Sequence, residues 1–356
     1  MARPDDRTPG AGASPGSTDR GTVPDPEADP VPDPVPVPAA DITDAAGWSR
    51  VTTTTVGGAA PRLDACLRPL QRGTGDPTLR HLDGIWWRTT RTPVGPALQA
   101  LRRVGADVSV TCWGEGAEWL AAHAGRLLGE ADTADGFDPS AHPLVAEAAR
   151  RRPWLRLGRT DAVLEALAAA AIEQVVTGKE AFRSQRVLVT RFGDPVGGAA
   201  AEPGRPAEGM RVPLSAQQWC AVPGWELLRA GVEERRRRPL VAGALRGRSL
   251  ERLASDGFPL DVDTALRSLP GVGPWTSAQV RQRALGDPDA WSVGDYHAGG
   301  LLTYALTGEQ LDDDACEEVL APFAGHRYRV EVLVLSLGIA PDRHGPRRSL
   351  PTHLPG

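Results

Sequence analysis

The strongest constraint on the fold is a short stretch in the C-terminal half, where two predicted helices flank a turn with two glycines. Apolar residues spaced three and four apart over residues 261–269 predict the first helix, because they lie on one helical face. The second helix is predicted over 276–285, with Thr276 as its N-terminal cap. The turn between them, "PGVG" (270–273), is short enough to fold the two helices into a hairpin.

The hairpin is compatible with two interpretations. Backbone N–H groups at the start of the second helix, together with the helix dipole, suit a phosphate oxygen. Glycine at 271 and 273 removes the Cβ atoms that would keep a DNA backbone away. An ordinary helical hairpin, in which the glycines serve only the turn geometry, explains "PGVG" equally well. The complete stretch "LPGVGPWTS" (269–277) favours DNA binding.

A single aspartate, Asp295, stands between "SVG" and a helix predicted over 296–306. An aspartate in that position usually caps the helix. Asp295 also follows the hairpin by about 20 residues, so it could face the sugar of a DNA strand held there. The sequence therefore leaves two roles open for Asp295, a helix cap and a catalytic carboxylate.

The rest of the chain predicts an α+β protein with a small N-terminal antiparallel sheet domain and an all-helical domain after it. Residues 46–140 contain β-branched and aromatic runs, which predict strands, and one amphipathic helix. The strands are expected at 51–56, 84–92 and twice within 97–113, and the helix at 116–129. Trp86 and Trp87 are expected in the core and on the surface of this sheet. Residues 141–340 read as helical, with a helix that starts at Thr160-Asp161 and a connecting loop at 193–209.

Both ends of the chain are predicted to be tails. Residues 1–45 contain ten prolines and nine acidic residues, with too little apolar surface to order them. The net charge of −5 comes from this tail, and the rest of the chain is close to neutral. Residues 341–356 form the C-terminal tail. "RRRR" (235–238) could contact phosphates or form a solvated helix face.

Several classes of protein are disfavoured. The longest apolar runs are too short to cross a bilayer, and the N-terminus lacks the apolar core of a secretory signal. We therefore expect a cytoplasmic protein with no membrane partner. The four cysteines have neither metal-ligand nor redox spacing, so we expect reduced thiols and no cofactor or catalytic metal.

The hairpin and the aspartate together resemble a known family. "LPGVGPWTS" followed by "WSVGD" (291–295) is similar to the hairpin, Gly/Pro-rich loop and aspartate of helix-hairpin-helix (HhH-GPD) base-excision DNA glycosylases. Within that superfamily the chain most resembles the 3-methyladenine DNA glycosylase II (AlkA-type) branch. The similarity covers most of residues 50–340, and its supporting stretches are 84–96, 113–120, 164–193, 231–244 and 325–335.

The resemblance implies a mechanism and a partner, which is double-stranded DNA containing a damaged base. The nucleotide is flipped out of the duplex, and Asp295 stabilises the positive charge that develops on the sugar. A monomer that associates with the nucleoid is expected. The residues implied are Gly271, Val272, Gly273, Trp275 and Thr276 at the phosphate, in some members with a monovalent cation on the hairpin backbone; Gln174 and Val175 in the DNA wedge; and Trp275, Gln174 and Gln279 in the base pocket.

The residue after the hairpin predicts the type of chemistry. Bifunctional relatives carry a lysine where this chain has Trp275, and that lysine forms a Schiff base with the sugar. The only lysine in the chain is Lys179, far away in the sequence. The resemblance therefore implies a monofunctional glycosylase without lyase activity, in which Trp275 provides an aromatic wall for an alkylated base.

The sequence also departs from the pattern of this branch. Gln279, Leu333 and Leu335 stand where pocket aromatics are expected. An alkylated purine is therefore the first substrate expected, and an oxidised or deaminated purine is the alternative. Two non-enzymatic hypotheses remain: a helix-hairpin-helix protein that binds damaged DNA without chemistry, and a helical protein whose hairpin is only structural.

Overall fold

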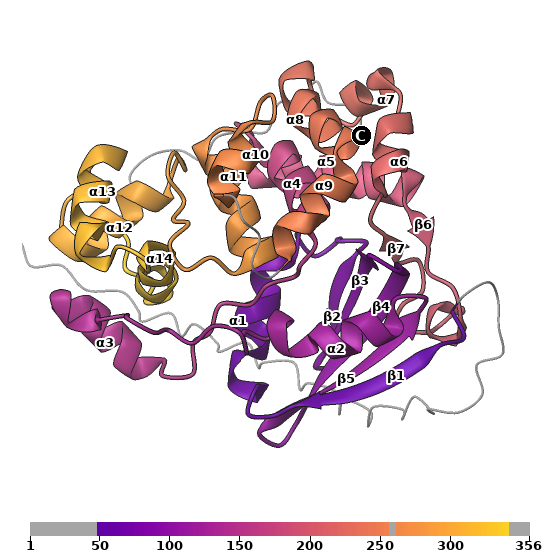
Figure 1. The fold of residues 1–356 in the computed structure, drawn as a ribbon, viewed down its shortest axis with the longest axis horizontal. Helices are drawn as coiled ribbons and strands as arrows, with labels where there is room; N and C mark the ends of the chain where they lie inside the picture. The colour runs from indigo at the N-terminus through magenta and orange to yellow at the C-terminus, as the bar shows by residue number, and fades with distance from the viewer. Residues whose placement is uncertain (1–47, 256–260, 342–356) are drawn as a thin grey trace, which may run out of the picture. The chain divides into compact units, whose positions relative to one another are not determined.

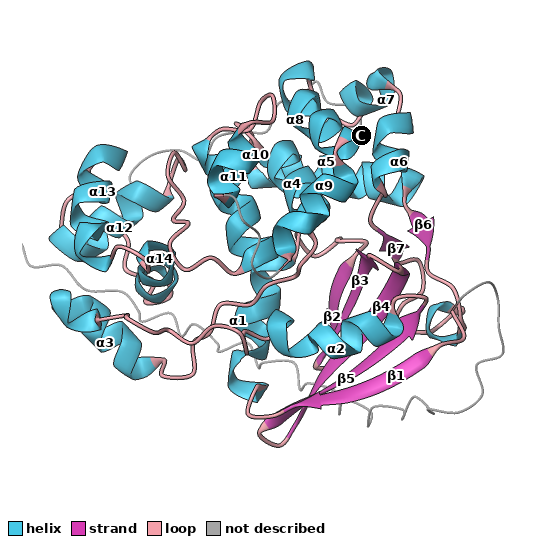
Figure 2. Ribbon diagram, viewed as in Figure 1, coloured by secondary structure: helices cyan, strands magenta, loops and turns pink. Residues whose placement is uncertain are grey.

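A five-stranded antiparallel sheet forms the N-terminal part of the computed structural model, which describes residues 48–255 and 261–341 (Figures 1 and 2). The predicted N-terminal tail, and all but the first residue of the C-terminal one, lie outside the described residues. The strand order is β1-β5-β4-β3-β2. The strands are β1 (Val51–Val56), β2 (Leu79–Leu82), β3 (Ile85–Thr92), β4 (Gly95–Val104) and β5 (Asp107–Gly114).

Both faces of the sheet are covered. Successive side chains on a strand point to opposite faces, so Trp86 and Trp87 enter different cores. Trp86 packs with apolar residues of α1 (Leu63–Leu67) and α2 (Ala117–Leu127). Trp87 stacks on Trp113 with ring centroids 5.8 Å apart. The surface position predicted for Trp87 is wrong, because the chain returns later to cover that face.

The segment that covers Trp87 is the connecting loop predicted at 193–209. The short strand β6 (Asp194–Pro195) lies near its start and pairs with β7 (Arg211–Val212), which follows its end. Val196, Met210 and Val212 are buried against the sheet. The α+β class is confirmed. The part predicted to be all-helical, residues 141–340, is not purely helical, because it contains β6 and β7. The glycines and prolines of the connecting loop hide scattered apolar residues that have no regular period, so periodicity could not find this core.

Helices make up most of the remaining described chain. The α-helices are α3 (Pro143–Arg151), α4 (Val163–Glu173), α5 (Gly178–Phe192), α6 (Ala216–Ala221), α7 (Gly224–Arg229), α8 (Glu234–Leu245), α9 (Gly247–Glu251), α10 (Val262–Arg267), α11 (Pro274–Val280), α12 (Ala298–Thr307), α13 (Asp313–Leu320) and α14 (Arg327–Leu335). The short 3-10 helices are η1 (Ala60–Arg62), η2 (Arg68–Leu70), η3 (Pro139–Ala141), η4 (Ala199–Ala201), η5 (Arg252–Ala254) and η7 (Ala321–Phe323), and η6 (Arg281–Leu285) is a π-helical turn that continues α11.

Helix α4 is the central helix of this part and packs against α8 and α11 (Figure 1). Its alanine-rich surface is buried almost all round, which allows neighbouring helices to approach closely. The sequence predicts that this helix starts at Thr160-Asp161, but neither side chain caps the N-terminus of α4. The carboxylate of Glu251 accepts hydrogen bonds from the N–H groups of Val163 and Leu164, both at 3.0 Å. Burial raises the pKa of Glu251 to about 7.

Polar contacts attach α4 to the sheet. The hydroxyl of Thr90 donates to Glu165 at 2.6 Å, and the guanidinium of Arg88 lies 3.3 Å from the same carboxylate. Arg72 pairs with Glu173, at the other end of α4, at 2.6 Å. These buried or half-buried pairs fix the sheet against the helix that leads into the site described below.

The last three helices form a separate apolar cluster with α3. Val145 of α3 packs there with Leu302 of α12 and Val330 of α14. A buried ion pair between Asp132 and Arg329 ties the chain before α3 to α14. The segment between η6 and α12 crosses from the α4 core to this cluster, and it carries Asp295.

Candidate active site and DNA interface

The hairpin consists of α10, a turn and α11, as the sequence predicts. Gly271 has a positive φ of 86°, and a Cβ atom there would lie 2.8 Å from the ring of Pro239 on α8. Glycine at 271 is therefore required by the turn and by α8, and not only by an approaching ligand. A Cβ at Gly273 would meet open space, so the backbone there is accessible from outside.

Two predicted phosphate ligands have other partners. Val272 is buried in the α4 core, and its N–H donates to the carbonyl of Leu269 at 3.1 Å. Thr276 is buried inside α11 and does not cap it, because Gly273 is the N-cap residue. No side chain among the described residues caps α11. The backbone N–H groups at Gly273, Trp275 and Thr276 are the predicted donors that remain at this helix start, since Pro274 has none and Ser277 donates the first bond inside the helix.

Gln174 and Val175 form the connection between α4 and α5. The side-chain amide of Gln174 donates to the carbonyl of Gly271 at 3.0 Å and to the hydroxyl of Thr276 at 2.8 Å. Gln174 therefore braces the hairpin. Val175 is 78% exposed and has a positive φ of 55°. A β-branched residue is strained in that conformation, and its exposed side chain gains nothing from burial.

Asp295 contacts both the start of α12 and the hairpin. One carboxylate oxygen accepts from the N–H groups of His297 and Ala298, at 2.9 and 3.0 Å, and so caps α12. The other accepts from the indole N–H of Trp275 at 3.1 Å. Asp295 also lines a pocket. The hairpin thus positions the carboxylate directly, through the residue that the sequence singled out.

This pocket has a volume of about 300 Å³. Its walls come from three parts of the chain: the end of α11 with η6, the segment around Asp295 together with the start of α12, and α14. Gln279 lines the pocket, as predicted, whereas Gln174 and Trp275 are not among the described lining residues. Leu335 lines it too, but Leu333 points into the apolar core.

The pocket also contains polar residues that the sequence did not indicate. Glu331 of α14 accepts from the N–H and the hydroxyl of Ser292, both at 2.7 Å. The hydroxyl of Ser292 also accepts from the amides of Gln279 and Gln282, at 3.2 and 3.0 Å. Burial and the nearby charge of Asp295 raise the pKa of Glu331 to about 7. A glutamate at a buried position of the apolar run "VEVLVL" (330–335) was the available signal.

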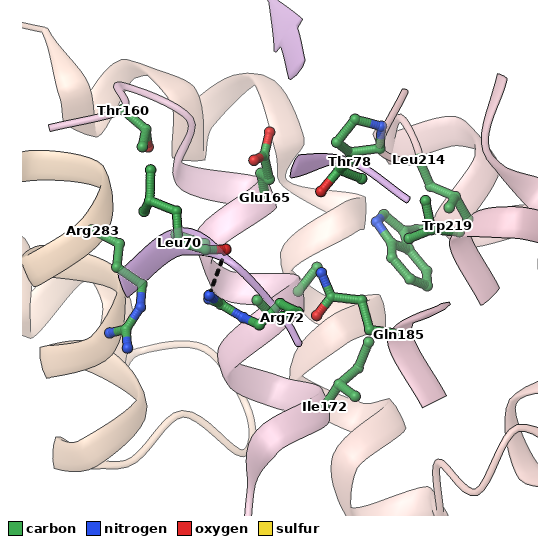
Figure 3. A pocket seen from close by; sticks show the side chains of 15 residues that line it. Leu70, Arg72, Thr78, Thr160, Glu165, Ile172, Gln185, Leu214, Trp219 and Arg283 are labelled. Carbon is green, nitrogen blue, oxygen red and sulfur yellow. Dashed lines mark hydrogen bonds between the residues drawn. The ribbon is translucent and has the colours of Figure 1, made fainter. Parts of the chain in front are cut away.

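A second cavity is lined by helices α4 and α5 and by the segment that leads from η2 to β2 (Figure 3). Its polar side chains include Arg72, Glu165 and Gln185, and Arg283 lines both cavities. Its volume of about 50 Å³ is room for one or two water molecules, at about 30 Å³ each. It is too small for a nucleobase, so the pocket at Asp295 is the better candidate for an active site.

Of the "RRRR" run, Arg236 is buried and donates to the carbonyls of Ile172 and Gly231. It is therefore a structural arginine of α8, neither a phosphate ligand nor part of a solvated face. Arg235 and Arg238 are exposed, so each could contact a phosphate or belong to a solvated helix face.

No group of three or more His, Cys, Asp or Glu side chains in residues 48–255 and 261–341 is arranged to hold a metal ion. Helices in those ranges are too short or too polar to span a lipid bilayer. Burial raises the pKa values of the thiols of Cys66, Cys112 and Cys316 to about 12, which makes them poor nucleophiles.

Solved structures share this architecture. The 3-methyladenine DNA-glycosylase from Archaeoglobus fulgidus matches with a TM-score of 0.61 at 19% identity, over 76% of this chain and 93% of that one. The 8-oxoguanine glycosylase/lyase from Clostridium acetobutylicum in its apo-form matches with a TM-score of 0.59 at 12% identity, over 81% and 99%. Its complex with double-stranded DNA containing cytosine opposite 8-oxoG matches with a TM-score of 0.60 at 11% identity, over 82% and 98%.

No protein-family model matches the chain, and no curated protein sequence does either. At such low identities the structural likeness establishes the fold. The chain has the helix-hairpin-helix fold that these DNA glycosylases share.

Proposed function

We propose that this protein is a base-excision DNA glycosylase that flips a damaged base out of a duplex and hydrolyses its N-glycosidic bond. The observation that carries the proposal is the position of Asp295. Its carboxylate lines a pocket of about 300 Å³ and is hydrogen-bonded to Trp275, directly after the hairpin turn. The shared fold supports the same reaction class.

Asp295 acts on the sugar. Loss of the base leaves positive charge on the deoxyribose, and a carboxylate held beside it stabilises that charge. Hydrogen bonds from His297, Ala298 and Trp275 keep Asp295 in one orientation, so little reorganisation is needed during the reaction. The same carboxylate orients or deprotonates the water molecule that adds to the sugar.

Val175 fills the space that the flipped base leaves. Flipping costs a few kcal/mol through lost stacking and pairing. An apolar side chain on a rigid, strained turn can insert between the neighbouring bases and offset part of that cost. Val175 has the required exposure, and Gln174 ties its turn to the hairpin. The accessible backbone at Gly273 and the N–H of Trp275 hold the adjacent phosphate.

The reaction is hydrolysis without strand cleavage. A lyase reaction through a Schiff base requires an amine at the sugar. Lys179, the only lysine of the chain, is exposed near the start of α5 and is absent from the described lining of the pocket. Trp275 holds Asp295 at the place where bifunctional relatives are expected to carry lysine.

An alkylated purine is the proposed substrate, in line with the 3-methyladenine glycosylase of the same fold. The hydrogen-bonding groups of Gln279, Gln282 and Ser292 in the pocket favour a second candidate. They could recognise the altered edge of an oxidised or deaminated purine, and the 8-oxoguanine glycosylase/lyase has the same fold.

Base release from duplexes with a single lesion tests the proposal. Alkylated purine, hypoxanthine, uracil and 8-oxoguanine are each presented to the wild type and to Asp295→Asn, and strand breaks are measured with and without alkali. We expect release by the wild type at least about 100-fold faster than by the variant, with breaks only after alkali. Breaks without alkali would contradict the monofunctional assignment. Binding of a lesion duplex without any release would favour a non-catalytic damage-binding protein.

A further inference from the structure

The pocket contains a second carboxylate for which the hydrolysis has no role. Glu331 shares the pocket with Asp295 and is only 7% exposed. Like charges in one pocket repel each other, and burial penalises the ionised form of Glu331. The fold nevertheless retains both acids, so the pocket suits something that relieves this repulsion.

Glu331 is held rigidly in the pocket wall. Both of its carboxylate oxygens accept from Ser292, whose hydroxyl also accepts from the amides of Gln279 and Gln282. Ser292 directly, and Gln279 and Gln282 through Ser292, therefore fix the position of this charge. Tyr328, Val332 and Leu335 lie on the same face of α14 and also line the pocket, so Glu331 cannot leave without repacking that helix.

The other charged and titratable groups around the pocket leave the acidic pair only partly compensated. The guanidinium of Arg283 donates to the side-chain oxygen of Gln282 at 3.0 Å and to the carbonyl of Gln279 at 3.4 Å. No hydrogen bond or ion pair joins Arg283 to Glu331 or Asp295 among the described residues. His297 and Tyr328 complete the titratable lining, and Cys316 is buried nearby in the adjacent cluster.

We propose that Glu331 is a specificity-determining residue that selects a base carrying a positive charge, as an N-alkylated purine does. This inference rests on the glycosylase function proposed above and names its substrate class. A cationic base held in the pocket with Asp295 and Glu331 interacts favourably with both carboxylates. A neutral base of the same shape leaves the repulsion in place. The pocket lining consists mainly of aliphatic and polar residues, with Tyr328 among them. It thus recognises the charge of the base, whereas the AlkA-type branch is expected to recognise the base by aromatic stacking.

The competing explanation is that Glu331 only holds Ser292, and through it the segment that carries Asp295. The N–H of Asp295 donates to the carbonyl of Ser292 at 3.1 Å, so such a positioning role is structurally sound. It would affect all bases alike. Discrimination between charged and neutral bases therefore separates the two explanations.

Binding to two matched duplexes tests the proposal without requiring catalysis. One duplex carries 2′-fluorinated N7-methyladenine, whose positive charge does not titrate and whose glycosidic bond resists cleavage. The other carries 7-methyl-7-deazaadenine with the same fluorinated sugar, which is neutral and nearly identical in shape. Dissociation constants are measured at pH 8 for the wild type, Glu331→Gln, Glu331→Asp and Glu251→Gln. Glu251 is the matched control, because it is a buried carboxyl that caps α4 away from the pocket.

We expect the wild type to bind the cationic duplex about 10-fold more tightly than the neutral one, which corresponds to about 1.4 kcal/mol. Glu331→Gln should bring this ratio close to one, Glu331→Asp should restore part of it, and Glu251→Gln should leave it unchanged. A wild-type ratio near one, or a ratio that survives in Glu331→Gln, would overturn the inference while leaving the glycosylase function intact. Failure to bind either duplex better than undamaged DNA would overturn the inference together with the alkylated-purine substrate, whereas the glycosylase function is tested by base release from the other lesions.

Discussion

At the scale of single residues, the most informative contact is the hydrogen bond from Trp275 to Asp295. The sequence predicted Trp275 as a wall of the base pocket, but the indole N–H donates to the catalytic candidate at 3.1 Å. Trp275→Phe keeps most of the ring and removes this donor. A hydrogen bond to a charged group is worth about 1.5 kcal/mol, so we expect base release to slow about 10-fold while affinity for undamaged duplex changes little.

Single-turnover release and duplex affinity, measured side by side, check this expectation. Trp86→Phe provides the control, because Trp86 makes the same type of bond to Asp64, at 2.8 Å, in the sheet. That variant should lose stability without losing the rate of the chemical step. An unchanged rate in Trp275→Phe would show that Asp295 is oriented by α12 alone.

At the scale of elements, the turn between α4 and α5 holds one exposed side chain, Val175, in a strained backbone conformation that lowers the stability of the fold. Val175 has a positive φ of 55°, a conformation that costs a β-branched residue about 1 kcal/mol or more. Val175→Gly relieves the strain, so we expect the free energy of unfolding to rise or stay level. Removing the wedge side chain should nevertheless slow base release about 10-fold, since a few kcal/mol of flipping energy would be less well offset.

Urea denaturation and single-turnover release test the two effects separately. Val94→Gly serves as the comparison, because Val94 is also well exposed, at 60%, but lies in the turn between β3 and β4. We expect that variant to release bases at the wild-type rate. Equal rates for Val175→Gly and the wild type would remove Val175 from the flipping step.

Elements with a strong period were predictable, and their ends were not. The strands at 51–56 and 84–92 and the hairpin helices appear where the sequence places them, because period-2 and period-3.6 patterns are local. The cap of α4 was missed because Glu251 is remote in sequence from Val163. The cap of α11 was misassigned to Thr276, whose hydroxyl instead accepts from Gln174. Long-range partners of this kind leave no local pattern.

At the scale of the whole molecule, the candidate site is assembled from segments that the sequence keeps apart. Asp295 and Gln279 were predictable from one local motif, whereas Glu331 reaches them only through the packing of α14 on the C-terminal cluster. The buried contact of 193–212 with the sheet was hidden in the same way. Folding therefore brings two acids of the helical part, Glu251 and Glu331, into positions where burial raises their pKa values to about 7.

These two carboxyls predict how global stability depends on pH. Each binds its proton more tightly in the folded protein than at the ordinary pKa of 4.5. Their contribution to stability is therefore complete below about pH 4.5 and is lost as the pH rises to about 7. Over that window the free energy of unfolding should fall by on the order of 1 kcal/mol per pH unit for each group. Carboxyls with lowered pKa values, such as Asp289 beside Arg327, titrate below this window.

Urea denaturation at pH 5, 6, 7 and 8 measures this slope. We expect the wild type to be most stable at the acidic end, and Glu251→Gln and Glu331→Gln each to flatten the curve by about half, because glutamine stays neutral throughout. In the double variant the two reductions of the pH slope should add, since the carboxyls lie in separate parts of the fold. If both variants keep the wild-type slope, the two carboxyls are ionised at little cost in the folded protein, and the repulsion on which charge selection by Glu331 depends is absent as well.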